Sequence, residues 1–234
     1  MQENTRKKRY FTGTEMLLFC CSEFLTVLTF LIFDRTHYLT LTASLIGAAS
    51  LVLNAKGNPL GQLLMVIFSV MYGIISMRQA YYGEMLTYLG MTGPMALFSL
   101  ISWLRNPFQG KRSEVAVNRL SRKEALLCIP LTAAVTAAFY LILRHFHTAL
   151  LPLSTLSVAT SFLAVYLTFR RSAQYALAYA ANDIVLIVLW TAAARQTPSY
   201  CSVVMCFLIF LANDLYGYVS WQRMKTKQVQ QNVR

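Results

Sequence analysis

Two apolar segments of this chain carry the same polar signature, an Asn-Asp pair with a Trp eight residues after the Asn. The residues are Asn182, Asp183 and Trp190 in the first segment, and Asn213, Asp214 and Trp221 in the second. Eight residues correspond to about two turns of a helix. A carboxyl group inside a membrane span costs at least ~2.5–3.5 kcal/mol, and by default it indicates a functional site. The alternative is that these groups only hydrogen-bond neighbouring helices.

Further polar and aromatic groups follow at helical spacing. In the last apolar segment, Tyr216, Gly217 and Ser220 share a face with Asn213 and Trp221. We expect amide, carboxyl and aromatic groups to converge at membrane depth and bind a small polar substrate. The predicted substrate-binding residues are Asn182, Asp183, Trp190, Asn213, Asp214, Tyr216, Trp221, Trp103, Tyr72 and Tyr88. The alternatives are anchoring at the membrane interface for the Trp residues near segment ends and simple packing for the Tyr residues.

The sequence offers no arrangement typical of an enzyme. It contains no G-x-S-x-G, no H-E-x-x-H and no phosphate-cradling glycine loop. The five cysteines all lie in apolar stretches without a C-x-x-C pair, and the three histidines are distant from them. We therefore expect no catalytic residue, no metal site and no cofactor.

The elements that must position the polar groups are membrane-spanning helices. Hydrophobic residues make up 56% of the 234 residues, charged residues only 13%, and the mean hydropathy is +0.49. Eight apolar runs have the ~20 residues that a bilayer core requires. They lie at 16–33, 38–55, 59–78, 83–104, 124–143, 150–169, 173–194 and 198–221. The first run is too long for a signal-peptide core and contains Glu23. The predicted fold is an all-α polytopic membrane protein.

The basic residues predict how these spans are oriented. With eight spans and the N-terminus inside, 17 of the 21 Lys and Arg residues lie in inside segments. This asymmetry follows the positive-inside rule, so both termini are expected in the cytoplasm. It also accounts for the net charge of +12 by attraction to an anionic leaflet. The expected partner is the lipid bilayer, not nucleic acid.

A short internal repeat divides the spans into two groups. Ser102-Trp103-x-Arg105 ends the fourth span, and Ser220-Trp221-x-Arg223 ends the eighth, 118 residues later. The same offset relates Tyr72 to Trp190. We therefore predict a 1+3+1+3 arrangement with two parallel three-helix repeats and a substrate site between them.

The repeat implies five regions along the chain. They are a leader with an extra helix (1–37), the first three-helix repeat (38–104), a cytoplasmic connector with a linker helix (105–149), the second repeat (150–221) and a cytoplasmic tail (222–234). Segment 106–123 has the composition of a solvated connector, and Ser121-x-x-Glu124 is typical of a capping box that opens the fifth span. Pro94 is expected to kink the fourth span, and the polar tail is expected to fray.

Several of these segments resemble the PnuC family of bacterial vitamin transporters. The resemblance covers spans three to eight and rests on Gln79–Met85, Pro94-Met95, Ser102–Arg105, Asn182–Ile184 with Leu189-Trp190, and Asn213–Gly217 with Trp221. It implies a fold similar to that of the sugar-exporting SWEET proteins and, often, a homotrimer. It also implies facilitated diffusion of nicotinamide riboside, which a cytoplasmic kinase traps by phosphorylation. Relatives are thought to carry thiamine, riboflavin or deoxynucleosides.

The resemblance further implies that Asn182, Trp190, Asn213 and nearby aromatic residues line the substrate site. Some members of the family carry an amide side chain after the Pro-Met pair and a Trp or Gly one turn before Trp103. Ala96, Ser99 and Leu100 occupy that stretch in this chain, so the fourth-span wall is less polar and the identity of the substrate stays open.

Our leading hypothesis is a uniporter for nicotinamide riboside in a bacterial cell membrane. Its cationic pyridinium would be attracted by aromatic faces with ~0.5–2 kcal/mol, while Asp183 or Asp214 balances the charge. Three alternatives remain at this stage. They are a binding subunit that needs an ATP-driven partner, a structural membrane protein, and proton coupling through the two aspartates.

Overall fold

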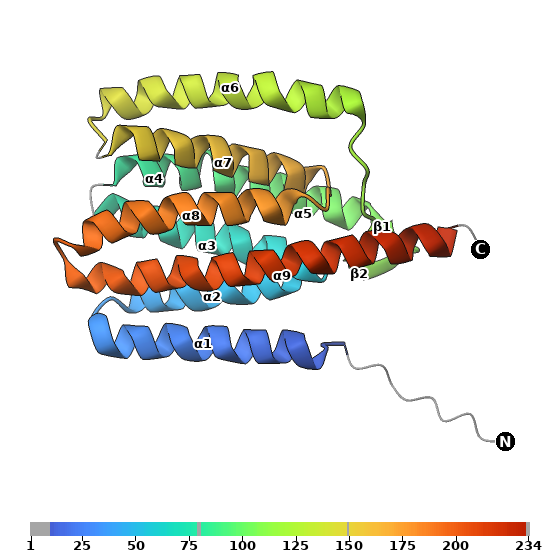
Figure 1. Cartoon of the computed structure of the whole chain (residues 1–234), viewed down its shortest axis with the longest axis horizontal. Helices are drawn as coiled ribbons and strands as arrows, with labels where there is room; N and C mark the ends of the chain where they lie inside the picture. Colours follow the sequence, from blue (N-terminus) through green and yellow to red (C-terminus); the bar gives the residue numbers. More distant parts are fainter. Residues whose placement is uncertain (1–9, 79–80, 149, 233–234) are drawn as a thin grey trace.

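The computed structural model describes residues 10–78, 81–148 and 150–232, and within these ranges it contains eight apolar helical spans (Figure 1). The first five helical segments are α1 (Gly13–Phe33), α2 (Tyr38–Ala55), α3 (Pro59–Arg78), α4 (Tyr82–Thr87) and α5 (Gly93–Arg105). The later ones are α6 (Arg122–His145), α7 (Leu151–Phe169), α8 (Tyr175–Ala194) and α9 (Cys201–Asn232), with a 3₁₀ turn, η2 (Pro198–Tyr200), before α9. The predicted all-α polytopic fold is confirmed.

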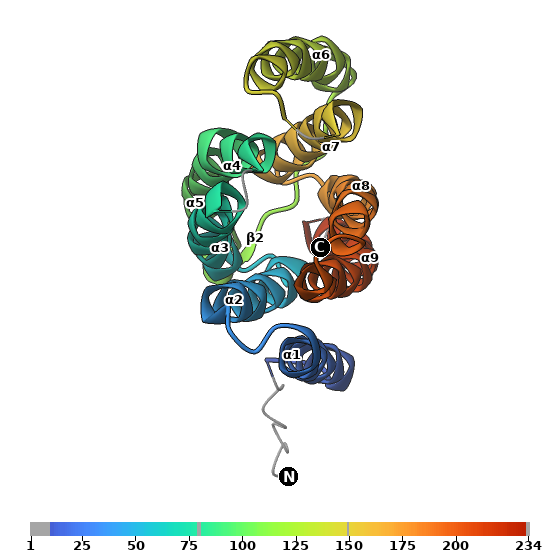
Figure 2. The same cartoon turned by 90° about the vertical axis from the view of Figure 1, so that its left-hand side faces the viewer.

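Six of the spans form a ring, and two lie outside it (Figure 2). Around the ring, α2 packs on α3, α3 on α5, α5 on α7, α7 on α8, α8 on α9, and α9 returns to α2. Outside the ring, α1 packs on both α2 and α9, whereas α6 packs on α7. The ring places the faces of helices from both halves of the chain around one centre.

The fourth span is interrupted where the sequence predicts a kink. Between α4 and α5, residues Tyr88–Thr92 form a π-helical turn, η1, in which the Gly93 N–H donates to the Tyr88 carbonyl. Pro94 follows directly and has no N–H to continue the α-helical ladder. π-helical turns of this kind are frequent at functional sites.

Both helices outside the ring begin with the same N-terminal capping motif. Thr12 and Glu15 form a capping box at the start of α1, and Ser121 and Glu124 form one at the start of α6, as predicted for the latter. Each Glu also pairs with a cation at the end of the next helix along the chain. Glu15 accepts from Lys56 at 2.8 Å, and Glu124 pairs with Arg170.

The connector and the tail differ from the sequence-based expectation. The connector contains a small antiparallel hairpin of β1 (Pro107–Phe108) and β2 (Lys111–Val115), and Val115 is fully buried. The Val115 N–H donates to the Gly57 carbonyl at 2.9 Å, so the hairpin is fixed to the α2–α3 turn. The expectation of a frayed tail is wrong. Helix α9 continues to Asn232 because the Gln228 side chain hydrogen-bonds to Val115 and Val117.

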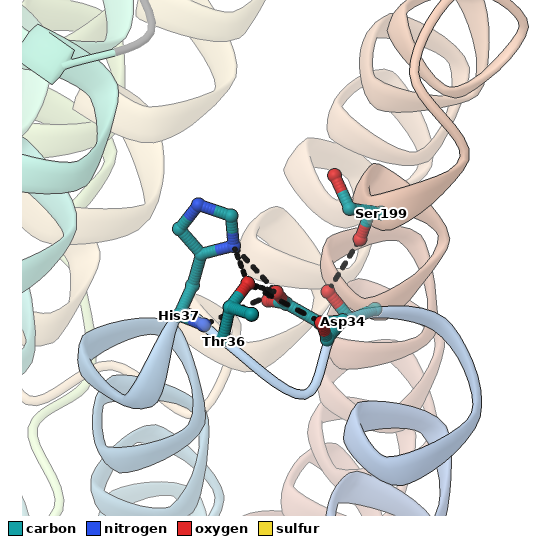
Figure 3. Close-up of polar contacts among 5 residues, drawn as sticks. Asp34, Thr36, His37 and Ser199 are labelled. Carbon is teal, nitrogen blue, oxygen red and sulfur yellow. Dashed lines mark hydrogen bonds and ion pairs between the residues drawn. The ribbon is translucent and has the colours of Figure 1, made fainter.

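At the opposite end of the molecule, the α1–α2 loop is organised around one carboxylate (Figure 3). The Thr36 hydroxyl and the His37 backbone N–H each lie 3.1 Å from the same Asp34 oxygen. Figure 3 also places Ser199, from η2, beside this loop. The loop therefore lies next to the turn that leads into α9.

Candidate functional site

Two carboxyl groups face each other at the centre of the ring. Asp183 of α8 and Asp214 of α9 line the same cavity and interact electrostatically, and each is at most 3% exposed. Two ionised carboxylates repel each other at short range, so such a pair is stable when one of them holds a proton or when a cation lies beside them. The pair can therefore hold a shared proton or, as the alternative, face a cation.

The pair lines a small closed cavity of about 20 Å³. That volume holds about one water molecule, whereas ligand sites in proteins usually measure ~300–1,000 Å³. Polar groups from α7, α8 and η1 share the lining with apolar side chains from α2 and α3. The polar residues besides the two aspartates are Tyr88, Thr92, Ser161, Tyr179 and Asn182. The cavity as it stands is too small for any ligand much larger than a water molecule.

Two atoms in this lining lack a hydrogen-bond partner within the described residues. They are Oδ2 of Asp183 and Oγ1 of Thr92, and both are buried. Unsatisfied buried polar atoms are costly and rare in native proteins, and each requires an explanation. Because both residues line the cavity, these atoms are candidates to contact a polar ligand there.

Asn182 is held in place by helix α7. Its amide oxygen accepts hydrogen bonds from Thr160 at 2.8 Å and from Ser161 at 2.9 Å. With the oxygen occupied, the side-chain NH₂ is the group that Asn182 can offer to a ligand. The substrate-binding role predicted for it is therefore that of a hydrogen-bond donor.

An aromatic cluster closes the cavity on the side away from the termini. The Trp190 indole N–H donates to the Tyr72 hydroxyl at 2.6 Å, and the Tyr72 and Tyr88 rings lie 4.3 Å apart. Tyr81 and Tyr200 pack on Trp190 at centroid distances of 4.9 and 5.4 Å. Burial, together with the neighbouring Tyr200, raises the pKa of the Tyr81 hydroxyl, so this outer layer stays uncharged.

A second aromatic cluster closes the side near the termini. Trp103 and Trp221 are fully buried with ring centroids 5.3 Å apart, and Tyr175 packs on Trp221 at 4.9 Å. The two indole N–H groups donate to backbone carbonyls at the ends of helices in the other half of the ring, to Thr168 at 3.0 Å and to Asn54 at 2.7 Å. Complete burial excludes the alternative that these Trp residues are interfacial anchors.

Asn213 and Tyr216 lie on the other side of α9. The Asn213 amide nitrogen donates to Ser22 of α1 at 3.0 Å and to its own helix at the Ile209 carbonyl. Tyr216 is half-buried and interacts with Glu15 at the start of α1. The structure does not bring these two residues to the cavity, and their assignment to the substrate site stays a prediction.

Glu84 is a candidate that the sequence reasoning missed. This carboxyl group in α4 is 2% exposed, and one of its oxygens has no hydrogen-bond partner within the described residues. It is close enough to Tyr72 and Tyr88 to interact with both electrostatically. The available signal was its position in the first turn of an apolar span.

The other missed residues lie one helical turn from predicted ones. Thr92 follows Tyr88 by four positions, and Tyr179 precedes Asp183 by four, so each shares a helix face with a predicted site residue. Ser161 belongs to α7, for which the sequence analysis named no candidate. Inspecting the positions four residues before and after each predicted residue would have found Thr92 and Tyr179, but not Ser161.

Comparison with known proteins identifies the family. The sequence model of the nicotinamide mononucleotide transporter family matches residues 37–223. The nicotinamide riboside transporter PnuC of Neisseria mucosa is 25% identical over 198 residues, which are 82% of this chain and 75% of that protein. Its namesake in Haemophilus influenzae is 24% identical over 188 residues, 80% of each chain.

A solved structure shares the fold of this chain. The crystal structure of the vitamin B3 transporter PnuC superposes with a TM-score of 0.82 at 21% identity, covering 93% of this chain and 94% of that one. The likeness extends over nearly all of the ring and its two outer helices. The chain belongs to the nicotinamide mononucleotide transporter family.

Proposed function

We propose that this chain carries nicotinamide riboside across a bacterial cell membrane by facilitated diffusion. The observation that carries the proposal is the pair Asp183 and Asp214, which faces a central cavity beside the Tyr88 ring. A nucleoside with a cationic base needs a counter-charge, an aromatic face and hydrogen-bond donors for its hydroxyl and amide groups. Asp183 and Asp214 supply the counter-charge, Tyr88 the aromatic face and Asn182 a hydrogen-bond donor. Close relatives bear the name nicotinamide riboside transporter.

Transport by this site requires alternate opening of its two aromatic closures. One closure joins α3 to α8 through Tyr72 and Trp190, and the other joins the fourth span to α9 through Trp103 and Trp221. Each therefore links the first half of the chain to the second. Rocking of the two halves around a central site would separate one closure while the other stays shut.

The orientation and the partners are part of the same proposal. We propose that the end of the molecule where α1 begins and α9 ends faces the cytoplasm, because the basic residues of the predicted inside segments favour that orientation by the positive-inside rule. There a kinase would phosphorylate the nucleoside and prevent its return. A homotrimer is the assembly that we propose for the membrane.

Uptake of labelled nicotinamide riboside into liposomes that contain only the purified protein tests the proposal. We expect saturable uptake that equilibrates without an energy source. Thiamine, riboflavin and deoxynucleosides, tested as competitors, would reveal a different substrate. A protein that binds the ligand but moves none of it would be a binding subunit that needs an ATP-driven partner.

The shared proton position of the aspartate pair favours a second candidate function, proton-coupled transport. Intramembrane carboxyl groups recur in proton relays, and Asp183 and Asp214 line the same cavity and interact electrostatically. Imposing a pH gradient on the same liposomes separates the two mechanisms. Accumulation above equilibrium that collapses with a protonophore would establish coupling.

A further inference from the structure

A second, polar pocket lies at the end of the molecule that holds both termini. Its volume is about 480 Å³, and four cations and two carboxylates line it. These charged residues are Glu15, Lys56, Lys111, Glu114, Arg223 and Lys227. The pocket does not share a residue with the central cavity. It is therefore a separate feature of the fold with an excess of positive charge.

The two carboxylates already have cationic partners. Glu15 pairs with Lys56 at 2.8 Å, and Glu114 with Lys227 at 3.7 Å. Among the described residues, no ion pair is made by Lys111 or Arg223. The pocket thus presents one ammonium and one guanidinium group whose charge is not neutralised by a neighbour.

Hydrogen bonds fix the strand and the helix that carry these two cations. Lys111 begins β2, which is fixed to the α2–α3 turn through Val115. Arg223 lies on α9, where the neighbouring Ser220 hydroxyl donates to the Ala55 carbonyl at 2.7 Å. The strand and the helix that carry Lys111 and Arg223 are thus each hydrogen-bonded to α2 or to the turn that follows it, and both cations line the same pocket.

We propose that this pocket binds a phosphate-bearing anion of the size of a mononucleotide. Arg and Lys are the residues that bind phosphate in proteins, by a fork of donors and by a point charge respectively. A volume of about 480 Å³ lies within the range of small-molecule sites and exceeds what inorganic phosphate needs. The choice of a nucleoside phosphate as ligand rests on the proposed function, because phosphorylation of the carried nucleoside would generate that anion on this side of the membrane.

The position of the pocket gives the bound anion a role in regulation. Lys56 comes from the α2–α3 turn and Lys111 from the hairpin, both in the first half of the chain, whereas Arg223 belongs to α9 in the second. An anion bound between these cations would hold the two halves of the chain together at the end of the molecule where the Trp103–Trp221 cluster closes the central cavity. Accumulated product would thereby slow further transport.

The chain offers a matched control for the experiment. Arg112 follows Lys111 on β2, and Lys225 follows Arg223 by two positions on α9, but neither lines the pocket. The double variants Lys111→Gln/Arg223→Gln and Arg112→Gln/Lys225→Gln therefore remove the same charge from the same two elements. Thermal shifts of the full-length protein in detergent are measured with nicotinamide mononucleotide, inorganic phosphate and nicotinamide riboside.

We expect the mononucleotide to stabilise the wild type and the Arg112/Lys225 variant alike, with at least tenfold weaker apparent affinity in the Lys111/Arg223 variant. Equal stabilisation of both double variants, or none of the wild type, overturns the anion site. The riboside shift should be the same in all three proteins. Its absence from all three would contradict the proposed function and leave the anion result standing.

A phospholipid headgroup carries the same chemistry and is the other source of phosphate at this surface. Phosphatidylglycerol is therefore titrated into each protein with phosphatidylcholine as the reference. Stabilisation by the anionic lipid through Lys111 and Arg223, without any by the mononucleotide, assigns the pocket to the lipid and overturns the role in regulation.

Discussion

Trp190 donates its indole N–H to the hydroxyl of Tyr72 at 2.6 Å, and these two residues are 118 positions apart in the chain. Trp103 and Trp221, whose rings lie 5.3 Å apart, are separated by the same 118 positions. A residue can touch its own equivalent in a repeat only where both lie near the axis that relates the two copies. Both closures of the central cavity therefore join positions that the predicted repeat makes equivalent.

Removing the Tyr72 hydroxyl tests the outer closure. In Tyr72→Phe the aromatic ring stays, but the Trp190 N–H loses its acceptor in a fully buried position, which costs ~1–3 kcal/mol. We expect the thermal midpoint to fall by several degrees, since ~1 kcal/mol corresponds to about 2–4 °C in a protein of this size. Tyr82→Phe, at a residue that is 40% exposed, serves as the control. Equal midpoints for the two variants would show that the hydrogen bond is absent.

Neutralising the aspartate pair tests the counter-charge. Asp183→Asn and Asp214→Asn each keep the shape of the side chain and remove the ability to carry a negative charge. We expect riboside uptake into liposomes to fall at least tenfold, equivalent to a loss of ~1.4 kcal/mol. Asp34→Asn, in the α1–α2 loop, should transport normally. Wild-type uptake by both single variants would refute the assignment.

Asn182 and Asn213 should behave differently although the sequence presents them as equivalents. Asn182→Ala removes a donor from the cavity, so the dissociation constant for the riboside should rise. Asn213→Ala breaks the contact with Ser22 and should lower stability while it leaves the dissociation constant nearly unchanged. Ligand titration and thermal unfolding of both variants measure the two quantities. The opposite pattern would place Asn213 in the site and exclude Asn182.

Trp103→Phe and Trp221→Phe should lose similar amounts of stability. Each variant keeps an aromatic ring and removes one hydrogen bond to a carbonyl at a helix end, a contribution of about 0.5–1.5 kcal/mol. The comparison of the two thermal midpoints checks this directly. A loss confined to one variant would mean that the two halves of the ring do not use the Trp in the same way.

The spans could be predicted from the sequence because each apolar run is about as long as the bilayer core is thick. The hairpin in the connector could not, because β2 reads Lys111-Arg112-Ser113-Glu114-Val115 and carries no apolar alternation. Its stability comes from tertiary contacts of Val115, which is fully buried. The helical tail has the same origin, since the Gln228 side chain is bonded to Val115 and Val117 of the connector.

The residue types of the candidate site could be predicted from the sequence, but the direction in which each side chain points could not. Intramembrane carboxyl groups mark Asp183 and Asp214 from the sequence alone. Asn213 and Asp214 are adjacent, however, and on a helix that is packed on both sides each of them meets a different neighbour. Only the closure of the ring determines that Asp214 faces the cavity and Asn213 faces α1.

The two helices outside the ring, α1 and α6, constrain motion of the two halves of the chain in different ways. Helix α6 packs on α7 and can move together with it. Helix α1, by contrast, packs on both α2 and α9, and its Ser22 is hydrogen-bonded to Asn213 of α9. A rocking motion leaves the first contact intact and shears the second. The free-energy barriers for opening toward the two sides of the membrane should therefore differ. The rate of transport would then depend on its direction, whereas the substrate gradient alone would set the concentrations at equilibrium.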